Sequence, residues 1–182
     1  MRLLGLGGAE GSGKDSSADI LVKRGWVKLG FADALRELAL ELNPILEGEG
    51  TVRLSDAQRE TFYNNTDILR MIDVLTRRGS SILRKCISES QAWQILFAID
   101  PLIHTGDKGL RYADALAIHG YYDAKWKYPE VRNFLQKLGT EGVRNVLGDD
   151  TWIAEAMRRA ADKMSKGCAG IVFADTRFPN EV

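Results

Sequence analysis

The residues best suited to chemistry lie close to the N-terminus, where residues 8–15 read GAEGSGKD. They follow the pattern G-x-x-x-x-G-K-[ST], except that Asp15 stands where a serine or threonine is usual. Glycines let backbone N–H groups face a polyanion, the start of a helix adds partial positive charge, and Lys14 adds a full charge near the β- and γ-phosphates. The pattern predicts a nucleoside triphosphate site.

The residues expected to bind the nucleotide are Gly8, Gly11, Ser12, Gly13, Lys14, Asp15 and Ser16. A glycine-rich turn with a chance lysine is the alternative, which the apolar run before the loop and the amphipathic stretch after it disfavour.

An acidic residue at the end of a buried strand would complete such a site. Residues 169–174 form a short apolar run typical of a buried parallel strand, and Asp175 follows directly. At the carboxyl edge of a sheet, beside the loop, this carboxylate is placed to hold Mg²⁺ or its water molecules. The Asp15 carboxylate is a hard, charged oxygen ligand that can replace the usual hydroxyl. Asp15 and Asp175 are therefore the expected metal ligands.

Four arginines lie at or near the ends of expected elements: Arg36, Arg132, Arg144 and Arg177. The planar guanidinium group donates two parallel hydrogen bonds and so suits phosphate oxygens. A solvated surface charge is the alternative for any one of them. Together they predict a second phosphate site that faces the triphosphate, with Arg177 bridging the two.

Hydrophobic periodicity and turn residues predict the elements that carry these groups. Strands are expected at residues 3–6, 26–31 and 169–174. Helices are expected at residues 14–23, 33–44, 55–77, 82–99, 129–138 and between 150 and 166. Asp33 is the expected N-cap of the second helix and Pro44 ends it. The Arg77-Arg78-Gly79 stretch is expected to close the third. Gly139 is expected to end the helix before it, and Thr140 to begin a short new one.

This alternation of strands and helices predicts an α/β fold of the P-loop NTPase type, with a parallel sheet flanked by helices. We expect one kinase domain over residues 1–182. Within it, a helical substrate-binding region covers about residues 46–128, and the stretch of about 46–98 is interpreted as an insertion.

The composition limits the possible partners. The chain has 182 residues, 45% hydrophobic and 27% charged, and its net charge is zero. No overall charge draws it to nucleic acid or to an acidic membrane, and Asp100-Pro101 interrupts the most apolar later run, at residues 93–103, so no membrane span is expected. Cys86 and Cys168 are expected to be reduced core thiols of a cytoplasmic protein.

Three further stretches resemble a known family. They are residues 31–36 (FADALR), 128–141 (YPEVRNFLQKLGTE) and 175–181 (DTRFPNE). Together with the G-S-G-K-D form of the loop, they resemble the deoxynucleoside monophosphate kinases of bacteriophages, in the order of that family. The resemblance covers about residues 1–45 and 100–182. It implies a fold akin to adenylate kinase, ATP and Mg²⁺ as cofactors, and transfer of the γ-phosphoryl group to a deoxynucleoside monophosphate (dNMP). Such an enzyme supplies nucleotides for DNA synthesis, in the host cytoplasm if phage-encoded.

The resemblance also implies roles for individual residues. Arg36 matches the arginine that holds the acceptor phosphate, while Arg132, Gln136 and Arg144 match a pair of helices on the substrate side. Lys14, Arg36 and Arg177 are the expected catalytic residues. Asp33 would contact the substrate sugar or metal-bound water, or else only cap its helix. The family has further C-terminal strands and a lid, which are not expected within residues 1–182, so the sequence leaves open whether it is part of a longer chain or a reduced version.

Three other functions stay open. A different small-molecule kinase with the same loop, such as a phosphomevalonate kinase, would share the donor site. An ATPase acting on nucleic acid is disfavoured by the zero net charge. A non-catalytic module would bind ATP without turning it over. The sequence leaves open which dNMP is accepted and whether the chain forms a homodimer.

Overall fold

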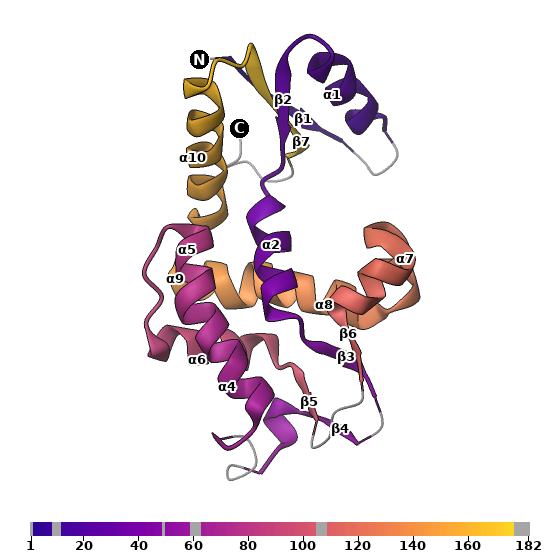
Figure 1. The fold of residues 1–182 in the computed structure, drawn as a ribbon, viewed down its shortest axis with the longest axis vertical. Helices are drawn as coiled ribbons and strands as arrows, with labels where there is room; N and C mark the ends of the chain where they lie inside the picture. The colour runs from indigo at the N-terminus through magenta and orange to yellow at the C-terminus, as the bar shows by residue number, and fades with distance from the viewer. Residues whose placement is uncertain (1, 9–11, 49, 59–62, 105–108, 177–182) are drawn as a thin grey trace. The chain divides into compact units, whose positions relative to one another are not determined.

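The computed structural model describes residues 2–8, 12–48, 50–58, 63–104 and 109–176. The chain divides into two compact units (Figure 1). Unit 1 comprises Met1–Ala34 and Asp150–Val182, and unit 2 comprises Leu35–Asp149. The fold is mixed α/β, with a parallel sheet in unit 1 and an antiparallel sheet in unit 2.

Unit 1 contains the elements that the sequence predicted most clearly. In chain order they are β1 (Leu3–Gly7), α1 (Lys14–Val22), β2 (Trp26–Leu29), α10 (Thr151–Ser165) and β7 (Gly170–Thr176). The strands form a parallel sheet in the order β1-β7-β2. The predicted parallel sheet with flanking helices is therefore confirmed for this unit.

The last strand lies at the centre of the sheet and holds both helices. Alternate side chains of a strand point to opposite faces. Ile171 and Phe173 accordingly pack in a core cluster with α10, whereas Val172 and Ala174 pack with Ala18 of α1. Figure 1 shows α1 and α10 on opposite faces of this sheet. Because β7 is buried on both faces, it reads in the sequence as a continuous apolar run.

Helix α2 (Asp33–Leu42) leads from unit 1 into unit 2. The elements that follow are β3 (Ile45–Glu47), β4 (Thr51–Arg53), the 3₁₀ turn η1 (Leu54–Asp56), α4 (Thr66–Asp73), η2 (Val74–Gly79), α5 (Ser80–Leu83), α6 (Glu89–Ile99), β5 (Leu102–His104), β6 (Leu110–Arg111), α7 (Tyr112–Lys127), α8 (Pro129–Lys137), η3 (Leu138–Arg144) and α9 (Asn145–Leu147). The segments η2 and η3 are π-helical.

The short strands of unit 2 form an antiparallel sheet in the order β4-β5-β3-β6. Ile103 of β5 lies opposite Val52 of β4, and Ile45 of β3 lies opposite Leu102. The sequence analysis expected a helical region over about residues 46–128 and did not anticipate this sheet. Strands of two or three residues are too short to show an alternating pattern.

Two helices predicted in unit 2 also had wrong boundaries. The helical run begins at Thr66, where the Asn65 side chain caps it, and not at residue 55. It continues through Gly79 to Leu83 and ends at Arg84, whose φ of 49° is left-handed. The predicted helix at 82–99 is therefore broken, and α6 begins after a capping box formed by Ser88 and Gln91.

Gly139 was predicted to end a helix, but α8 continues through η3 into α9 without a break. A Cβ atom at Gly139 would lie 3.2 Å from Cδ2 of Leu35. Glycine at this position thus allows α2 to approach closely. Thr140 begins no new helix, and the run ends at Gly148, which has a φ of 115°.

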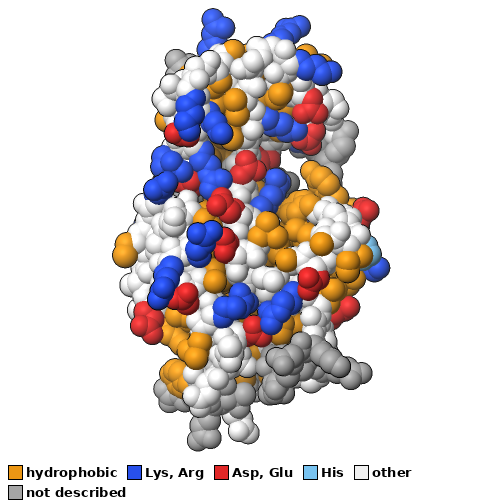
Figure 2. Space-filling model, in the orientation of Figure 1, with side chains coloured by type: hydrophobic (Ala, Val, Ile, Leu, Met, Phe, Trp, Pro, Cys, Tyr) orange, Lys and Arg blue, Asp and Glu red, His pale blue; other side chains and the backbone are white. Residues whose placement is uncertain are grey.

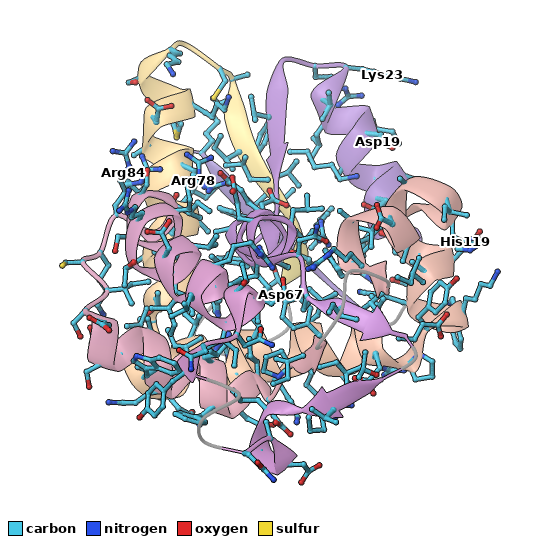
Figure 3. All side chains as sticks on the ribbon, turned by 60° about the horizontal axis from the view of Figure 1, so that its bottom comes forward. Asp19, Lys23, Asp67, Arg78, Arg84 and His119 are labelled. Carbon is cyan, nitrogen blue, oxygen red and sulfur yellow. The ribbon has the colours of Figure 1, made fainter. Side chains whose placement is uncertain are left out.

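One ion-pair network joins three elements of unit 2. Asp67, in the first turn of α4 (Figure 3), pairs with Arg111 of β6 at 2.9 Å and with Arg70 at 3.5 Å. Arg70 in turn donates a hydrogen bond to the carbonyl of Leu42, at the end of α2, at 2.7 Å. The last carbonyls of a helix lack intrahelical partners, so Arg70 supplies one and fixes α4 against α2.

Cys86 and Cys168 are free thiols, but Cys86 is exposed rather than part of a core. Among the helices of the described ranges, none is both long enough and apolar enough to cross a membrane.

A buried carboxylate lies in α10. Glu155 has a fully buried side chain and accepts hydrogen bonds from Arg158 and Arg159, each at 2.7 Å. Burial alone would raise the pKa of Glu155, but the two guanidinium groups outweigh it and lower the pKa below its ordinary value of 4.5. A carboxyl group with a lowered pKa stabilises the fold above its unfolded pKa, and this contribution is lost as the pH falls through the folded pKa.

Glu155→Gln should therefore lower the free energy of unfolding by about 1–3 kcal/mol near pH 7, because it removes the charge of the acceptor in three partly buried hydrogen bonds. Below pH 4.5 the difference from the wild type should shrink. Urea unfolding at a series of pH values, followed by tryptophan fluorescence, measures both. Glu141→Gln, at an exposed site of unit 2, is the control. A difference that stays constant down to pH 3 would contradict this account.

Candidate functional site

The glycine-rich loop leads into the N-terminus of α1. Gly13 occupies the N-cap position with a φ of 79°, and the N–H of Ser17 donates to the carbonyl of Gly13 at 2.9 Å as the first helical bond. A helix start presents backbone N–H groups and partial positive charge. The predicted residues Ser12, Gly13, Lys14, Asp15 and Ser16 thus lie at such a helix start, whereas Gly11 lies outside the described residues.

Lys14 folds back over its own loop. Its Nζ atom donates to the carbonyl of Gly8 at 2.8 Å and to Oγ of Ser12 at 3.2 Å. Gly8 has a φ of 143°, and a Cβ atom there would lie 2.9 Å from Oγ of Ser12. Only glycine fits this position without strain. The ammonium group is exposed and bound to neutral oxygens, which charged phosphate oxygens can replace as stronger acceptors.

Asp15 is held in an ion pair that the sequence analysis did not anticipate. Its Oδ1 atom lies 2.6 Å from Nζ of Lys28 on β2, and Asp19 lies 3.3 Å from the same atom. The hydrogen bond to Asp15, with the help of Asp19, raises the pKa of Lys28. The pair joins the start of α1 to β2. A metal ion bound by Asp15 would have to share this carboxylate with Lys28 or displace it.

Asp175 lies at the edge of the sheet where the loop begins. Gly7, at the end of β1, is opposite Thr176 in the register of the sheet. The carboxylate of Asp175 accepts hydrogen bonds from the backbone N–H groups of Phe31 at 2.9 Å and Ala32 at 3.1 Å. It therefore ties the end of β7 to the turn that follows β2.

Asp33 completes the same turn. Its carboxylate accepts from the N–H of Gly30 at 2.7 Å, so it supports the residues just before α2. A Cβ atom at Gly30 would lie 2.8 Å from an oxygen of Asp33 and 2.8 Å from one of Asp175. Glycine is required because two carboxylates approach the chain here.

The predicted metal ligands do not belong to a preformed cluster. In the described part of the chain, no three His, Cys, Asp or Glu side chains are grouped so that they could hold a metal ion. Mg²⁺ in phosphate-transfer sites is usually held by one or two carboxylates together with substrate phosphates. The exposed carboxylate of Asp15, at the start of α1, fits such a role.

The predicted acceptor residues belong to unit 2, apart from Asp33 and Arg177. Arg36, on α2, places its Cζ atom 4.8 Å from the ring centroid of Tyr121. Arg132 and Gln136 lie exposed on α8, and Arg144 lies half-buried at the end of η3. Arg177 lies outside the described residues.

Sequence reasoning missed the other cation beside Tyr121. The Nζ atom of Lys125 lies 4.2 Å from the same ring centroid. The two residues are four positions apart on α7, which is a spacing that brings side chains together on a helix. That spacing was the available signal, but it occurs too often in helices to indicate a site by itself.

No protein-family model matches this chain, and a search of curated proteins finds no match either. The assignment of a function therefore depends on the residues and geometry of the site.

Asp175→Asn tests the turn that supports this site. An amide side chain has one acceptor oxygen, and its NH₂ group would face the second backbone N–H. The variant should lose about 1–3 kcal/mol of unfolding free energy, measured by urea denaturation at pH 7. Asp162→Asn, which removes the charge from an exposed pair with Lys166, should lose much less. Equal losses in the two variants would show that Asp175 does not hold the turn.

Proposed function

We propose that the protein is a P-loop kinase that transfers the γ-phosphoryl group of ATP to a deoxynucleoside monophosphate. The observation that carries the proposal is the loop itself. Lys14 bridges Gly8 and Ser12 at the start of α1, and the neighbouring strand β7, which carries Asp175, ends at Thr176 opposite Gly7. This combination supports a site for the phosphates of a nucleoside triphosphate.

The chemistry needs few protein groups. The acceptor is a phosphate that is already anionic near neutral pH, so no general base is required. Catalysis then consists of positioning the two substrates and neutralising the charge that develops on the transferred group. Lys14 serves the donor, and Arg36 serves the acceptor. Mg²⁺, held by the triphosphate with Asp15 or Asp175, would supply further neutralisation.

The choice of acceptor depends on the resemblance to the phage kinases, whose motifs include Arg36, Arg132, Gln136 and Arg144. A phosphomevalonate kinase would use the same donor loop, and a panel of acceptors distinguishes the two. For an enzyme acting on nucleic acid, a basic surface would be expected. Figure 2 instead shows Lys and Arg side chains intermingled with Asp and Glu over the visible face.

Lys14→Met should nearly abolish phosphoryl transfer, because it removes the cation that meets the γ-phosphate. A loss of about 3 kcal/mol or more in transition-state stabilisation corresponds to at least about a hundredfold in rate. The measurement is dNMP-dependent formation of ADP. Lys23→Met is the matched control, since Lys23 extends away from the same unit into solvent (Figure 3). A Lys14→Met protein that keeps most of its turnover would refute the assignment.

Asp15→Ala should raise the Mg²⁺ concentration needed for half-maximal activity, and Asp15→Ser should restore part of the wild-type response, because serine supplies the usual hydroxyl. Lys28→Met separates this role from the ion pair, since it removes the partner but leaves the carboxylate in place. If Asp15→Ala leaves the metal dependence unchanged, Asp15 serves only the ion pair and the helix start.

A further inference from the structure

Two cations converge on one aromatic ring in unit 2. Arg36 reaches Tyr121 from α2 and Lys125 reaches it from α7, at 4.8 and 4.2 Å from the ring centroid. Helix α7 is interrupted at Gly120, which has a φ of 74° and a ψ of 168°. A new helical segment therefore begins at Tyr121, and it carries Lys125 one turn later. Both Tyr121 and Lys125 are half-exposed, so a ligand can reach them.

A second tyrosine of unit 2, Tyr112, has a buried hydroxyl group. Tyr112 is fully buried, and its ring packs edge-on against Phe134 with centroids 5.6 Å apart. Its hydroxyl group has no hydrogen-bond partner among the described residues. Burial raises the pKa of Tyr112, the charge of Tyr121 raises it further, and the charge of Arg36 lowers it. A buried polar group without a partner is costly, and a ligand oxygen would remove that cost.

The two cations act on the hydroxyl group of Tyr121. Burial alone would raise the pKa of Tyr121, but hydrogen bonds from Lys125 and Arg36, together with their charges, lower it. A cation over an exposed aromatic ring contributes only about 0.5–1 kcal/mol. Two like charges that share one ring also repel each other. The arrangement is therefore better matched to a bound anion than to stability alone.

We propose that Arg36, Lys125 and the hydroxyl groups of Tyr112 and Tyr121 bind the phosphate of a phosphomonoester. The guanidinium group supplies a planar pair of donors, the ammonium group a second charge, and the two phenols further donors. Two positive charges match the two negative charges of the phosphate group. The identity of the ligand rests on the proposed function: it is the acceptor dNMP, and Lys125, Tyr112 and Tyr121 join Arg36 as its binding residues.

The test is equilibrium binding by calorimetry on the whole chain, with dAMP, dCMP, dGMP, dTMP and inorganic phosphate as probes. Lys125→Met should weaken binding of the accepted nucleotide by about tenfold or more, because it removes a charge-assisted hydrogen bond. Tyr112→Phe should weaken it by about threefold to tenfold while the unfolding free energy stays equal or rises, since a hydroxyl group without a partner is removed. A merely structural role for Tyr112 predicts the opposite change in stability.

Two controls match these variants. Lys127→Met and Tyr122→Phe alter neighbouring exposed side chains of α7 and should bind the probes as the wild type does. ATP affinity should be unchanged in all four variants. Phosphoryl transfer to each dNMP is assayed in parallel for the wild type and all four variants.

The outcomes separate the two proposals. If Lys125→Met and Tyr112→Phe bind each probe as tightly as the wild type, or if the wild type binds none of them, this inference is overturned, whatever the transfer assay shows. If binding depends on Lys125 and Tyr112 but the wild type phosphorylates no dNMP, the phosphate site stands and the proposed kinase function fails.

Discussion

The carboxylate of Asp175 accepts hydrogen bonds from the backbone of Phe31 and Ala32, and this contact joins the end of β7 to the turn after β2. Asp33 holds the same turn through Gly30, where no side chain would fit between the two acids. Since β7 is the central strand between α1 and α10, the turn is fixed to the best-buried part of unit 1. The carboxyl edge of the sheet, where the loop begins, is thereby defined by two acids bound to backbone.

The charged groups of the loop are engaged with their own chain. Lys14 contacts Gly8 and Ser12, and Asp15 is paired with Lys28. These interactions are exposed, and exposed ion pairs contribute little to stability. A triphosphate and its metal ion can therefore take over both groups at small cost. Phosphate binding would exchange the neutral oxygens of Gly8 and Ser12 for charged ones, whose hydrogen bonds are stronger.

Local signals in the sequence were sufficient for unit 1. The strands, α1 and α10 were predicted because apolar runs, helical spacing and glycine loops occur together there. Unit 2 was predicted poorly, because its strands β3 to β6 are paired across long stretches of chain and are too short to show a pattern.

Gly79 and Gly139 resemble helix ends but lie within continuous helical runs, where close packing against Ile87 and Leu35 requires a small residue. The Ser88 and Gln91 capping box was readable and was overlooked. The proposed binding roles of Tyr121 and Lys125 depend on a bend of α7 at Gly120, which no local sequence pattern predicts.

The central claim is that the loop delivers a phosphoryl group to a nucleotide rather than to water. A rapid-quench experiment with γ-³²P-labelled ATP, Mg²⁺ and each dNMP in turn tests it directly. The account predicts that label appears in a deoxynucleoside diphosphate in a single turnover, with little inorganic phosphate. Label found only in inorganic phosphate, or kept entirely in ATP with every acceptor, would contradict it.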